Sequence, residues 1–323
     1  MNIFITGATG FVGSYLVEEM SKEGHYILCL TRNIENVSLP TYDNVEFVQG
    51  DINDVSTYEK FLKDVDVIYH LAGYVRHEAH KREEAYNNNV IGSRNIFNLA
   101  LTNNIDRVVY MSSAGIFHSK DDSIFNEDSK VPSKFINYYS YSKYLGYLEA
   151  KKFIKQGLDI SIIMPVSIYG PGSGLFVDFF DFLVKKKIFF KNLLYKKLSL
   201  VYIKDVVEVL IKVSETSGAG HEYLLTGKTL RVKDIIKIIE DTFAIRIIIL
   251  NVPLFLMSIS ISFLDIVSKL IRKNFFINRE MFNFLVGSLL VSSDKIKSEL
   301  KWEPSNFDKT FLEMLYWYKN NFK

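Results

Sequence analysis

The stretch Met1-Asn2-Ile3-Phe4-Ile5-Thr6-Gly7-Ala8-Thr9-Gly10-Phe11-Val12-Gly13 decides the fold of this chain. Residues 1–6 predict a short buried strand, and apolar residues at helical spacing follow it. A strand that enters a helix through glycines gathers backbone N–H groups and the positive end of the helix dipole, which suits a pyrophosphate. Gly7 makes the tight turn, Gly10 admits the phosphate and Gly13 lets the helix pack on the strand. The stretch therefore predicts dinucleotide binding.

Length and composition indicate a large globular chain. With 323 residues, 48% of them hydrophobic, it can bury the core of one large domain or of a larger and a smaller one. The formal charge of +2 gives no basis for a nucleic-acid partner. The single cysteine, Cys29, excludes an internal disulfide framework, and Met1 leads into the strand without a signal-peptide layout. We expect a cytoplasmic protein.

Strand and helix patterns alternate through the first half of the chain. This alternation predicts an α/β fold, a doubly wound parallel (Rossmann) sheet over residues 1–164, to which the chain returns around 200–213. Residues 165–323 are expected to form mainly a smaller, substrate-binding α/β part. The expected strands are 25–30, 45–49, 66–73 with its turn, 107–112, 220–227 with its turn and 245–252, and the expected helices are 54–62, 82–101, 137–156, 229–243, 253–264 and 311–322.

The end of the second strand bears on the choice of cofactor. Enzymes that prefer NAD usually carry Asp or Glu here, whereas this chain has Thr31-Arg32, which fits a 2′-phosphate and favours NADP over NAD. The alternative is that Arg32 is an ordinary solvent-exposed residue after the strand, which leaves the choice between NADP and NAD open. After the third strand, Asp51 is placed to accept a hydrogen bond from the adenine amino group, or else is a turn aspartate.

The carboxyl ends of the fourth and fifth strands are expected to face the ligand. Ala72 and Gly73 leave room for a cofactor to cross, and Ser112 and Ser113 supply hydroxyls. Open α/β sheets place their ligands at this edge.

Tyr139 and Lys143 are the candidate acid–base pair. They lie one helical turn apart and share a face. A tyrosine has a reference pKa near 10, and a neighbouring ammonium together with an oxidised nicotinamide favours the phenolate. Such a tyrosine takes a proton from a substrate hydroxyl while hydride leaves the same carbon. Ser113 would hold the substrate oxygen, and Lys143 would also bind the nicotinamide ribose.

Spacing alone does not identify this pair. Tyr147 and Lys151 have the same spacing and read as an ordinary surface pair. What separates Tyr139 and Lys143 is their order after a glycine turn and a strand that ends in serine.

These landmarks together resemble an extended short-chain dehydrogenase/reductase of the NAD-dependent epimerase/dehydratase family. The resemblance covers essentially the whole chain and is carried by an ordered set of motifs. They are GATGFVG (7–13), GDI (50–52), HLAG (70–73), NNVIGSRN (88–95), SSAGIF (112–117), YSYSK (139–143), MPVSIYGPG (164–172), LVYIKDV (200–206) and SDKIKSELKWEP (293–304).

The resemblance implies roles for individual residues. It implies Ser113, Tyr139 and Lys143 as catalytic, Asn89 as a structural residue beside the cofactor, and Pro165 as part of the wall around the nicotinamide. It also implies a homodimer through a helix bundle that includes the Tyr139 helix. The residues expected to line the cofactor are Gly7, Thr9, Gly10, Phe11, Val12, Gly13, Arg32, Asp51, Ile52, Leu71, Ala72, Gly73, Asn89, Tyr139, Lys143 and Pro165.

Two departures from the family pattern limit the function. Met164 stands where the family usually has Arg, so one polar anchor is missing. Ser113-Ala114-Gly115 stands where the family's nucleotide-sugar dehydratases carry Thr-Asp-Glu, which argues against a 4,6-dehydratase.

Three functions remain open. The first is an NAD(P)-dependent nucleotide-sugar epimerase or 4-keto reductase, which the broad landmarks and the basic stretch 185–197 favour. The second is an NADPH-dependent reductase resembling dihydroflavonol reductase and 3β-hydroxysteroid dehydrogenase, favoured by Arg32, Met164 and the apolar stretch 253–264. The third, a non-catalytic dinucleotide-binding protein, is disfavoured because serine, tyrosine and lysine are all present.

Three further features carry alternatives. Residues 247–264 contain no charge and predict a core strand plus helix, or else a helix on a membrane surface in weak contact. The aromatic and basic stretch 176–195 predicts a clamp for a diphosphate and base, a contact with a membrane surface, or a helix with a solvated basic end. His77 and His80 lack carboxylate or cysteine company, so no metal site is expected.

Overall fold

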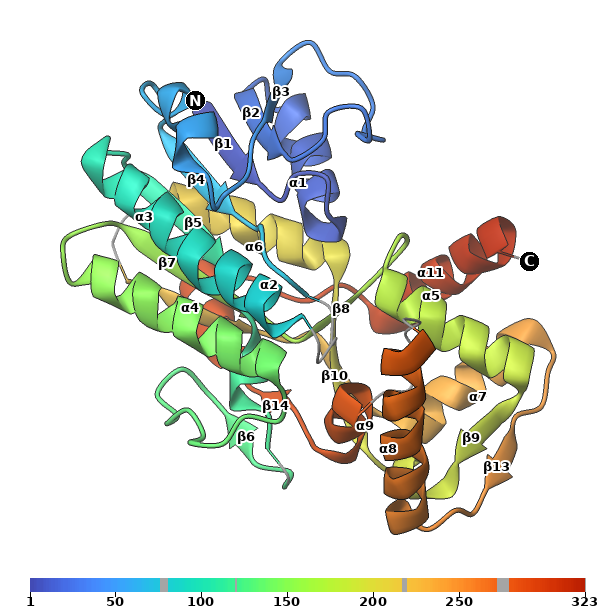
Figure 1. Cartoon of the computed structure of the whole chain (residues 1–323). Coiled ribbons are helices and arrows are strands. Elements are labelled where there is room, and N and C mark those ends of the chain that lie inside the picture. Colours follow the sequence, from blue (N-terminus) through green and yellow to red (C-terminus); the bar gives the residue numbers. More distant parts are fainter. Residues whose placement is uncertain (76–80, 120, 217–219, 272–278, 323) are drawn as a thin grey trace.

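A seven-stranded parallel sheet organises the molecule (Figure 1). The computed structural model describes residues 1–75, 81–119, 121–216, 220–271 and 279–322. The strand order is β11-β7-β5-β4-β1-β2-β3, so the chain starts in the middle of the sheet and winds outward in both directions. The expected doubly wound α/β fold is confirmed. The strands are β1 (Asn2–Thr6), β2 (Tyr26–Thr31), β3 (Val45–Gln49), β4 (Val67–His70), β5 (Arg107–Met111), β7 (Ile160–Pro165) and β11 (Glu222–Leu225).

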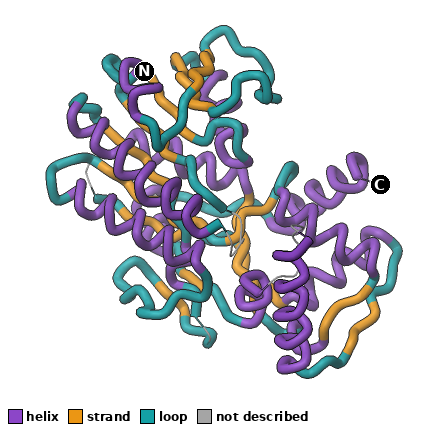
Figure 2. The backbone as a smooth tube through the Cα atoms, in the orientation of Figure 1, coloured by secondary structure: helices purple, strands orange, loops and turns teal. Residues whose placement is uncertain are grey.

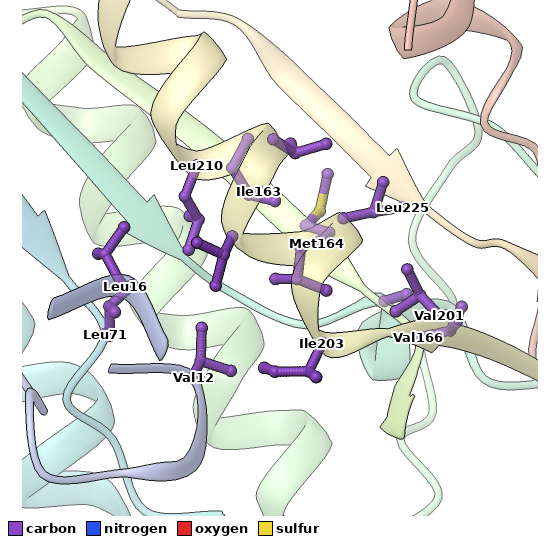
Figure 3. Close-up of a cluster of buried hydrophobic side chains, with 14 of the residues drawn as sticks. Val12, Leu16, Leu71, Ile163, Met164, Val166, Val201, Ile203, Leu210 and Leu225 are labelled. Carbon is purple, nitrogen blue, oxygen red and sulfur yellow. The ribbon is translucent and has the colours of Figure 1, made fainter. Parts of the chain in front are cut away.

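Helices cover both faces of this sheet. α1 (Phe11–Lys22) and α6 (Ile203–Glu215) lie on one face, and α3 (Ser93–Thr102) and α4 (Tyr138–Ile154) lie on the other. Because the inner strands β1, β4, β5 and β7 are covered on both sides, they are mostly apolar runs, whereas the edge strand β3 exposes Glu46 and Gln49. Figure 3 shows side chains of α1, β7 and α6 packed together, including Val12, Leu16, Ile163, Met164, Ile203 and Leu210.

The C-terminal half adds smaller sheets and further helices (Figure 2). β8 (Ser167–Tyr169), β10 (Lys197–Tyr202) and β12 (Lys228–Arg231) form one sheet, which lies between the large sheet and the helices of the C-terminal half. β9 (Ile188–Phe190) pairs with β13 (Ile248–Leu250), and β6 (Ile124–Phe125) pairs with β14 (Leu290–Val291). The remaining helices are α5 (Gly174–Asp181), α7 (Val232–Phe243), α8 (Leu254–Ile271), α9 (Arg279–Val286), α10 (Asp294–Leu300) and α11 (Phe307–Phe322).

Two expected helices differ in the structure. Residues 54–62 form two short 3₁₀ turns, because the Thr57 hydroxyl binds the Asp54 carbonyl and the Asp51 amide and so competes with a helix. The helix expected at 229–243 begins only at Val232, because residues 228–231 pair antiparallel with β10. Tertiary pairing overrides local helical preference at this second position.

The long helix expected over 82–101 is continuous but not uniform. It consists of α2 (Arg82–Tyr86), a π-helical turn over Asn87–Gly92, and α3. Gly92 lies against Ile52, since a Cβ on Gly92 would be 2.5 Å from Ile52 Cδ1. A π-helical turn often marks a functional position, and this one contains Asn89.

The apolar stretch 247–264 forms a strand and a helix, but not in the core. The strand is limited to Ile248–Leu250, and the exposed fractions of the Ile248, Phe255, Ile259 and Phe263 side chains are 61 to 64%. The expectation of core packing is therefore wrong for the outer half of this segment. Among the described residues, the structure contains no helix long and apolar enough to span a membrane.

The stretch 176–195 is not one helix with a basic end. α5 continues through a π-helical turn at 182–186, and the chain then forms β9 and a 3₁₀ turn at Lys191–Leu193. Lys187, with φ of 54°, stops the helix before the strand.

Gly13 allows the close contact between α1 and the glycine turn. A Cβ at this position would overlap the Gly7 carbonyl oxygen and lie 2.7 Å from the Ala8 Cα, both of which are backbone atoms. We expect Gly13→Ala to lower the free energy of unfolding by about 1–3 kcal/mol, because the backbone must shift to admit the methyl group. Urea unfolding measures this change.

Gly174→Ala is the matched control. Gly174 has open space around the position of a Cβ, so its substitution should leave stability within about 0.5 kcal/mol. Equal stability of the two variants would contradict the assigned role of Gly13.

Candidate functional site

Tyr139 and Lys143 are positioned by the start of α4. The Asn137 side chain caps this helix, because its Oδ1 accepts a hydrogen bond of 2.8 Å from the Ser140 amide. The cap fixes the first turn of α4 beside the end of β5. Tyr139 is partly exposed, whereas the Lys143 side chain runs inward and is 2% exposed.

Ser113 and Tyr139 meet at the end of β5. The Ser113 hydroxyl accepts a hydrogen bond of 3.1 Å from the Gly115 amide, which orients the oxygen. A Cβ on Gly115 would be 3.1 Å from Ser113 Oγ and 3.9 Å from Tyr139 Cε1, so both side chains border the same space. Burial raises the pKa of Tyr139, and a hydrogen bond with Ser113 opposes that rise.

Lys143 carries its amine to the edge of the sheet. Its Nζ donates a 3.1 Å hydrogen bond to the Met111 carbonyl oxygen, and a Cβ on Gly73 would lie 3.1 Å from Nζ. Burial lowers the pKa of Lys143 to about 8. In the protein alone the Lys143 amine lies on the carbonyl of Met111, and burial outweighs the hydrogen bond with Ser113 in setting the Tyr139 pKa. The expected lowering of this pKa, which also requires an oxidised nicotinamide, stays a prediction.

The glycine turn lies against the end of β4. Gly7 has φ of +76°, and a Cβ there would be 2.7 Å from the Ala72 amide nitrogen. Gly10 is exposed, and its amide donates a 3.0 Å hydrogen bond to the Gly7 carbonyl. These bare backbone surfaces at the start of α1 fit a pyrophosphate that crosses the sheet edge toward Gly73.

Arg32 and Asp51 lie on the opposite side of β1 from Lys143. Arg32 is exposed after β2, and Asp51 follows β3, where its Oδ1 accepts hydrogen bonds of 2.9 and 3.0 Å from Asn53. The residues proposed to bind the adenosine and those proposed to bind the nicotinamide therefore lie at opposite ends of the same sheet edge, the one formed by the carboxyl ends of the strands. Of the others, Thr9 is exposed, Phe11 partly buried, and Val12, Gly13, Ile52, Leu71 and Pro165 buried.

Asn89 ties this edge to α4 through hydrogen bonds that the sequence did not reveal. Its Oδ1 accepts from the Tyr74 amide at 2.8 Å, and its Nδ2 donates to the Tyr74 carbonyl at 3.1 Å and to Ser142 Oγ at 2.9 Å. Ser142 in turn donates a 2.8 Å bond to the Tyr139 carbonyl. A Cβ on Gly146 would overlap the Asn89 carbonyl oxygen, so this glycine lets α4 approach.

A buried histidine extends this network to β1. His70 Nε2 lies 2.9 Å from Ser93 Oγ, and Ser93 itself donates to the Asn89 carbonyl at 3.0 Å. Nε2 is therefore the protonated nitrogen, and Nδ1 accepts a 2.7 Å bond from the Thr6 hydroxyl. Burial, with a smaller contribution from Lys143, lowers the pKa of His70 to about 3. His70 is neutral and structural.

The sequence carried only weak signals for these residues. His70 follows three apolar residues in a strand, which marks it as buried, and Gly146 is a small residue inside a helix. Neither pattern predicts which residues His70 and Gly146 contact. Among the described residues, no three His, Cys, Asp or Glu side chains gather as metal ligands, and His77 and His80 lie outside the described residues.

The neutral state of His70 predicts a pH dependence of stability. The unfolded chain binds the proton more readily, so His70 contributes its full stabilisation above about pH 6.5, and this is lost as the pH falls toward about 3. His70→Gln removes the titration and disturbs the bonds to Thr6 and Ser93. We expect it to lower stability by about 1–3 kcal/mol at pH 7 and to flatten the acid slope.

Urea unfolding at a series of pH values measures both effects. His25→Gln is the control, because His25 pairs with Glu23 outside this network. The same acid slope in wild type and His70→Gln would refute the assignment.

Comparison with known proteins places the chain in a family. The model of the NAD dependent epimerase/dehydratase family matches residues 3–225. A putative dihydroflavonol 4-reductase of Synechocystis is 34% identical over 176 residues, which cover 52% of this chain and 49% of that protein. A putative UDP-glucose 4-epimerase of Methanocaldococcus jannaschii is 26% identical over 264 residues, covering 76% of this chain and 83% of that protein.

Solved structures agree with the fold. A UDP-glucose 4-epimerase from Thermotoga maritima, solved with UDP-glucose, has a TM-score of 0.78 at 18% identity and covers 100% of both chains. A dTDP-glucose 4,6-dehydratase from Streptomyces venezuelae, solved with NAD, has a TM-score of 0.79 at 21% identity and covers 99% of this chain and 98% of that one. With the family match over residues 3–225, the chain belongs to the NAD-dependent epimerase/dehydratase family.

Proposed function

We propose that this protein transfers a hydride between a nicotinamide dinucleotide and the carbon of a secondary alcohol or ketone, with Tyr139 as acid and base. The observation that carries the proposal is the convergence of three side chains at one sheet edge. Ser113 and Tyr139 border the same space, and the Lys143 amine lies at Met111, two residues before Ser113.

The glycine turn and the ends of β4 and β7 fit a dinucleotide. Gly7 lets the turn lie against the backbone of Ala72, and the start of α1 offers backbone N–H groups that no side chain caps. Lys143 would bind the nicotinamide ribose, and Pro165 would form part of the wall around the ring. When bound, the cofactor supplies or accepts the hydride.

Ser113 and Tyr139 have separate roles in binding and protonating the substrate oxygen. Ser113 donates a hydrogen bond to the substrate oxygen, and Tyr139 gives that oxygen a proton during reduction or removes one during oxidation. Burial raises the pKa of Tyr139, so the site holds the phenol, which is the form that donates a proton to a ketone.

Two reactions use this chemistry. Net reduction of an apolar ketone is the first candidate, supported by an apolar cavity beside β8. Epimerisation or 4-keto reduction of a nucleotide sugar is the second, supported by the fold neighbours solved with UDP-glucose. A purely dinucleotide-binding role is disfavoured by the placement of Ser113, Tyr139 and Lys143.

NADP is the proposed cofactor because Arg32 is free to meet a 2′-phosphate. It is exposed after β2, and Thr31 before it is neutral, so no carboxylate stands at the strand end to repel that phosphate.

Substitution of Tyr139 tests the proposed chemistry. Tyr139→Phe removes the hydroxyl and should lower turnover by about 10²–10⁴-fold, the usual contribution of a general acid or base. The rate of NADPH oxidation with a ketone substrate measures it, and dinucleotide binding should persist.

Tyr147→Phe is the matched control. Tyr147 and Lys151 both bind Glu222, and Tyr147 Oη donates to that carboxylate at 2.9 Å, so this pair is structural. Turnover should survive this change. Equal activity of Tyr139→Phe and Tyr147→Phe would remove Tyr139 from the mechanism.

Substitution of Arg32 tests the cofactor assignment. Arg32→Ala should weaken NADPH binding by about tenfold or more, since a charge-assisted hydrogen bond is worth about 1.5–3 kcal/mol, and should leave NADH binding unchanged. Calorimetric titration with each dinucleotide measures the ratio. Tighter binding of NADH than NADPH to the wild type would contradict the NADP preference.

A further inference from the structure

An apolar cavity of about 70 Å³ lies in the C-terminal half. Six of its thirteen lining residues are phenylalanines, and Ser167 carries the one polar side chain among the described lining residues. Phe176, Phe189 and Met257 are buried in its wall, whereas Leu175 at its edge is 40% exposed. Such a lining offers hydrogen bonds to almost no polar group, so it suits a hydrocarbon.

The cavity is connected to the proposed catalytic site along the chain. Ser167, in its lining, lies two residues beyond Pro165 at the start of β8, and Pro165 ends β7, which pairs with β5 just before Ser112. Phe282 of α9 also lines the cavity, and α9 leads to Gly287, which lies against the His118 ring in the segment after Ser113. β8 therefore leads from the sheet edge that carries the site to the wall of the cavity.

Helix α8 connects the cavity with the molecular surface. Its inner face supplies Met257 to the cavity wall, and its outer face exposes Phe255, Ile259 and Phe263, which recur every four residues. The exposed fractions of these three side chains are 64, 63 and 64%. When a helix is apolar on both faces, one face packs on the protein core and the other is expected to contact a second apolar surface outside the protein.

Basic residues border this exposed face. Asn192 donates a 2.8 Å hydrogen bond to the Val252 carbonyl, which places exposed Lys191 beside the start of α8. Arg279 of α9 binds Ser258 at 3.0 Å and Ser262 at 2.8 Å on α8. Apolar side chains with a cationic border complement an anionic lipid surface.

We propose that α8 docks on an anionic lipid surface and that the cavity takes a short segment of the hydrocarbon chain of a substrate from that surface. The proposal deepens the proposed function, on which it rests, by naming the substrate class: an alcohol or ketone that carries a hydrocarbon chain. The polar reacting carbon lies at Ser113 and Tyr139, and the chain lies along β8 toward α8.

Two sets of variants separate docking from chain binding. Phe255→Ser with Ile259→Ser removes apolar surface from the outer face, and Leu175→Lys places a cation at the edge of the cavity. Leu312→Ser with Tyr316→Ser is the matched control, because these exposed residues lie on α11, away from the cavity lining. All of these positions are exposed, so the fold should persist.

Two measurements that need no turnover read out the result. The full-length protein is sedimented with vesicles of phosphatidylcholine, with and without phosphatidylglycerol, and is titrated in a calorimeter with 1-hexanol as the hydrocarbon-chain probe. We expect wild type and the α11 control to bind the anionic vesicles. The α8 variant should bind the anionic vesicles at least tenfold more weakly but bind the probe as the wild type does. Leu175→Lys should bind the probe at least tenfold more weakly but bind the vesicles as the wild type does.

Three results would overturn the proposal: no binding of the wild type to anionic vesicles, equal vesicle binding by the α8 variant, or no binding of the probe. A dimer in light scattering that the α8 variant converts to a monomer would also overturn it, since a second copy would then cover α8. Because neither assay uses Tyr139, their failure is distinct from failure of the hydride-transfer proposal.

Discussion

The side-chain amide of Asn89 is the interaction on which the candidate site depends. It binds both backbone groups of Tyr74, just after the turn that closes β4, and it binds Ser142 on α4. Each such bond has a net worth of only about 0.5–1.5 kcal/mol, but a buried amide left unpaired would cost more. These hydrogen bonds therefore fix the position of the turn beside the glycine loop relative to α4, the helix that carries Tyr139.

The same network explains why a histidine lies inside the sheet. Neutral His70 accepts from Thr6 and donates to Ser93, so β1, β4 and α3 are linked below the turn. Ala72 also donates its amide to Thr6 Oγ1, at 3.2 Å. The buried side chains of Thr6, His70 and Ser93 are thus satisfied, which favours a single arrangement of this part of the edge.

Much of the fold could be predicted from sequence because its signals are local. The glycine turn, the apolar strands and the helix starting after Asn137 each follow from short patterns. The differences arise where tertiary contacts decide: β10 draws residues 228–231 into a strand, and the Thr57 hydroxyl interrupts a helix. The exposure of Phe255 and Ile259 was equally beyond a hydropathy pattern, which records that a segment is apolar but not what covers it.

The candidate site residues were proposed from their type and order in the sequence, but their contacts could not be predicted in this way. Ser113 and Tyr139 border one space, whereas Lys143 reaches the Met111 carbonyl instead of the tyrosine. We infer that this amine binds the ribose of a nicotinamide dinucleotide. A crystal structure of the protein grown with NADPH tests this inference. We expect the nicotinamide ribose within hydrogen-bond distance of Lys143 Nζ and the ring beside Pro165; a dinucleotide bound with its nicotinamide away from both residues would contradict the proposed site.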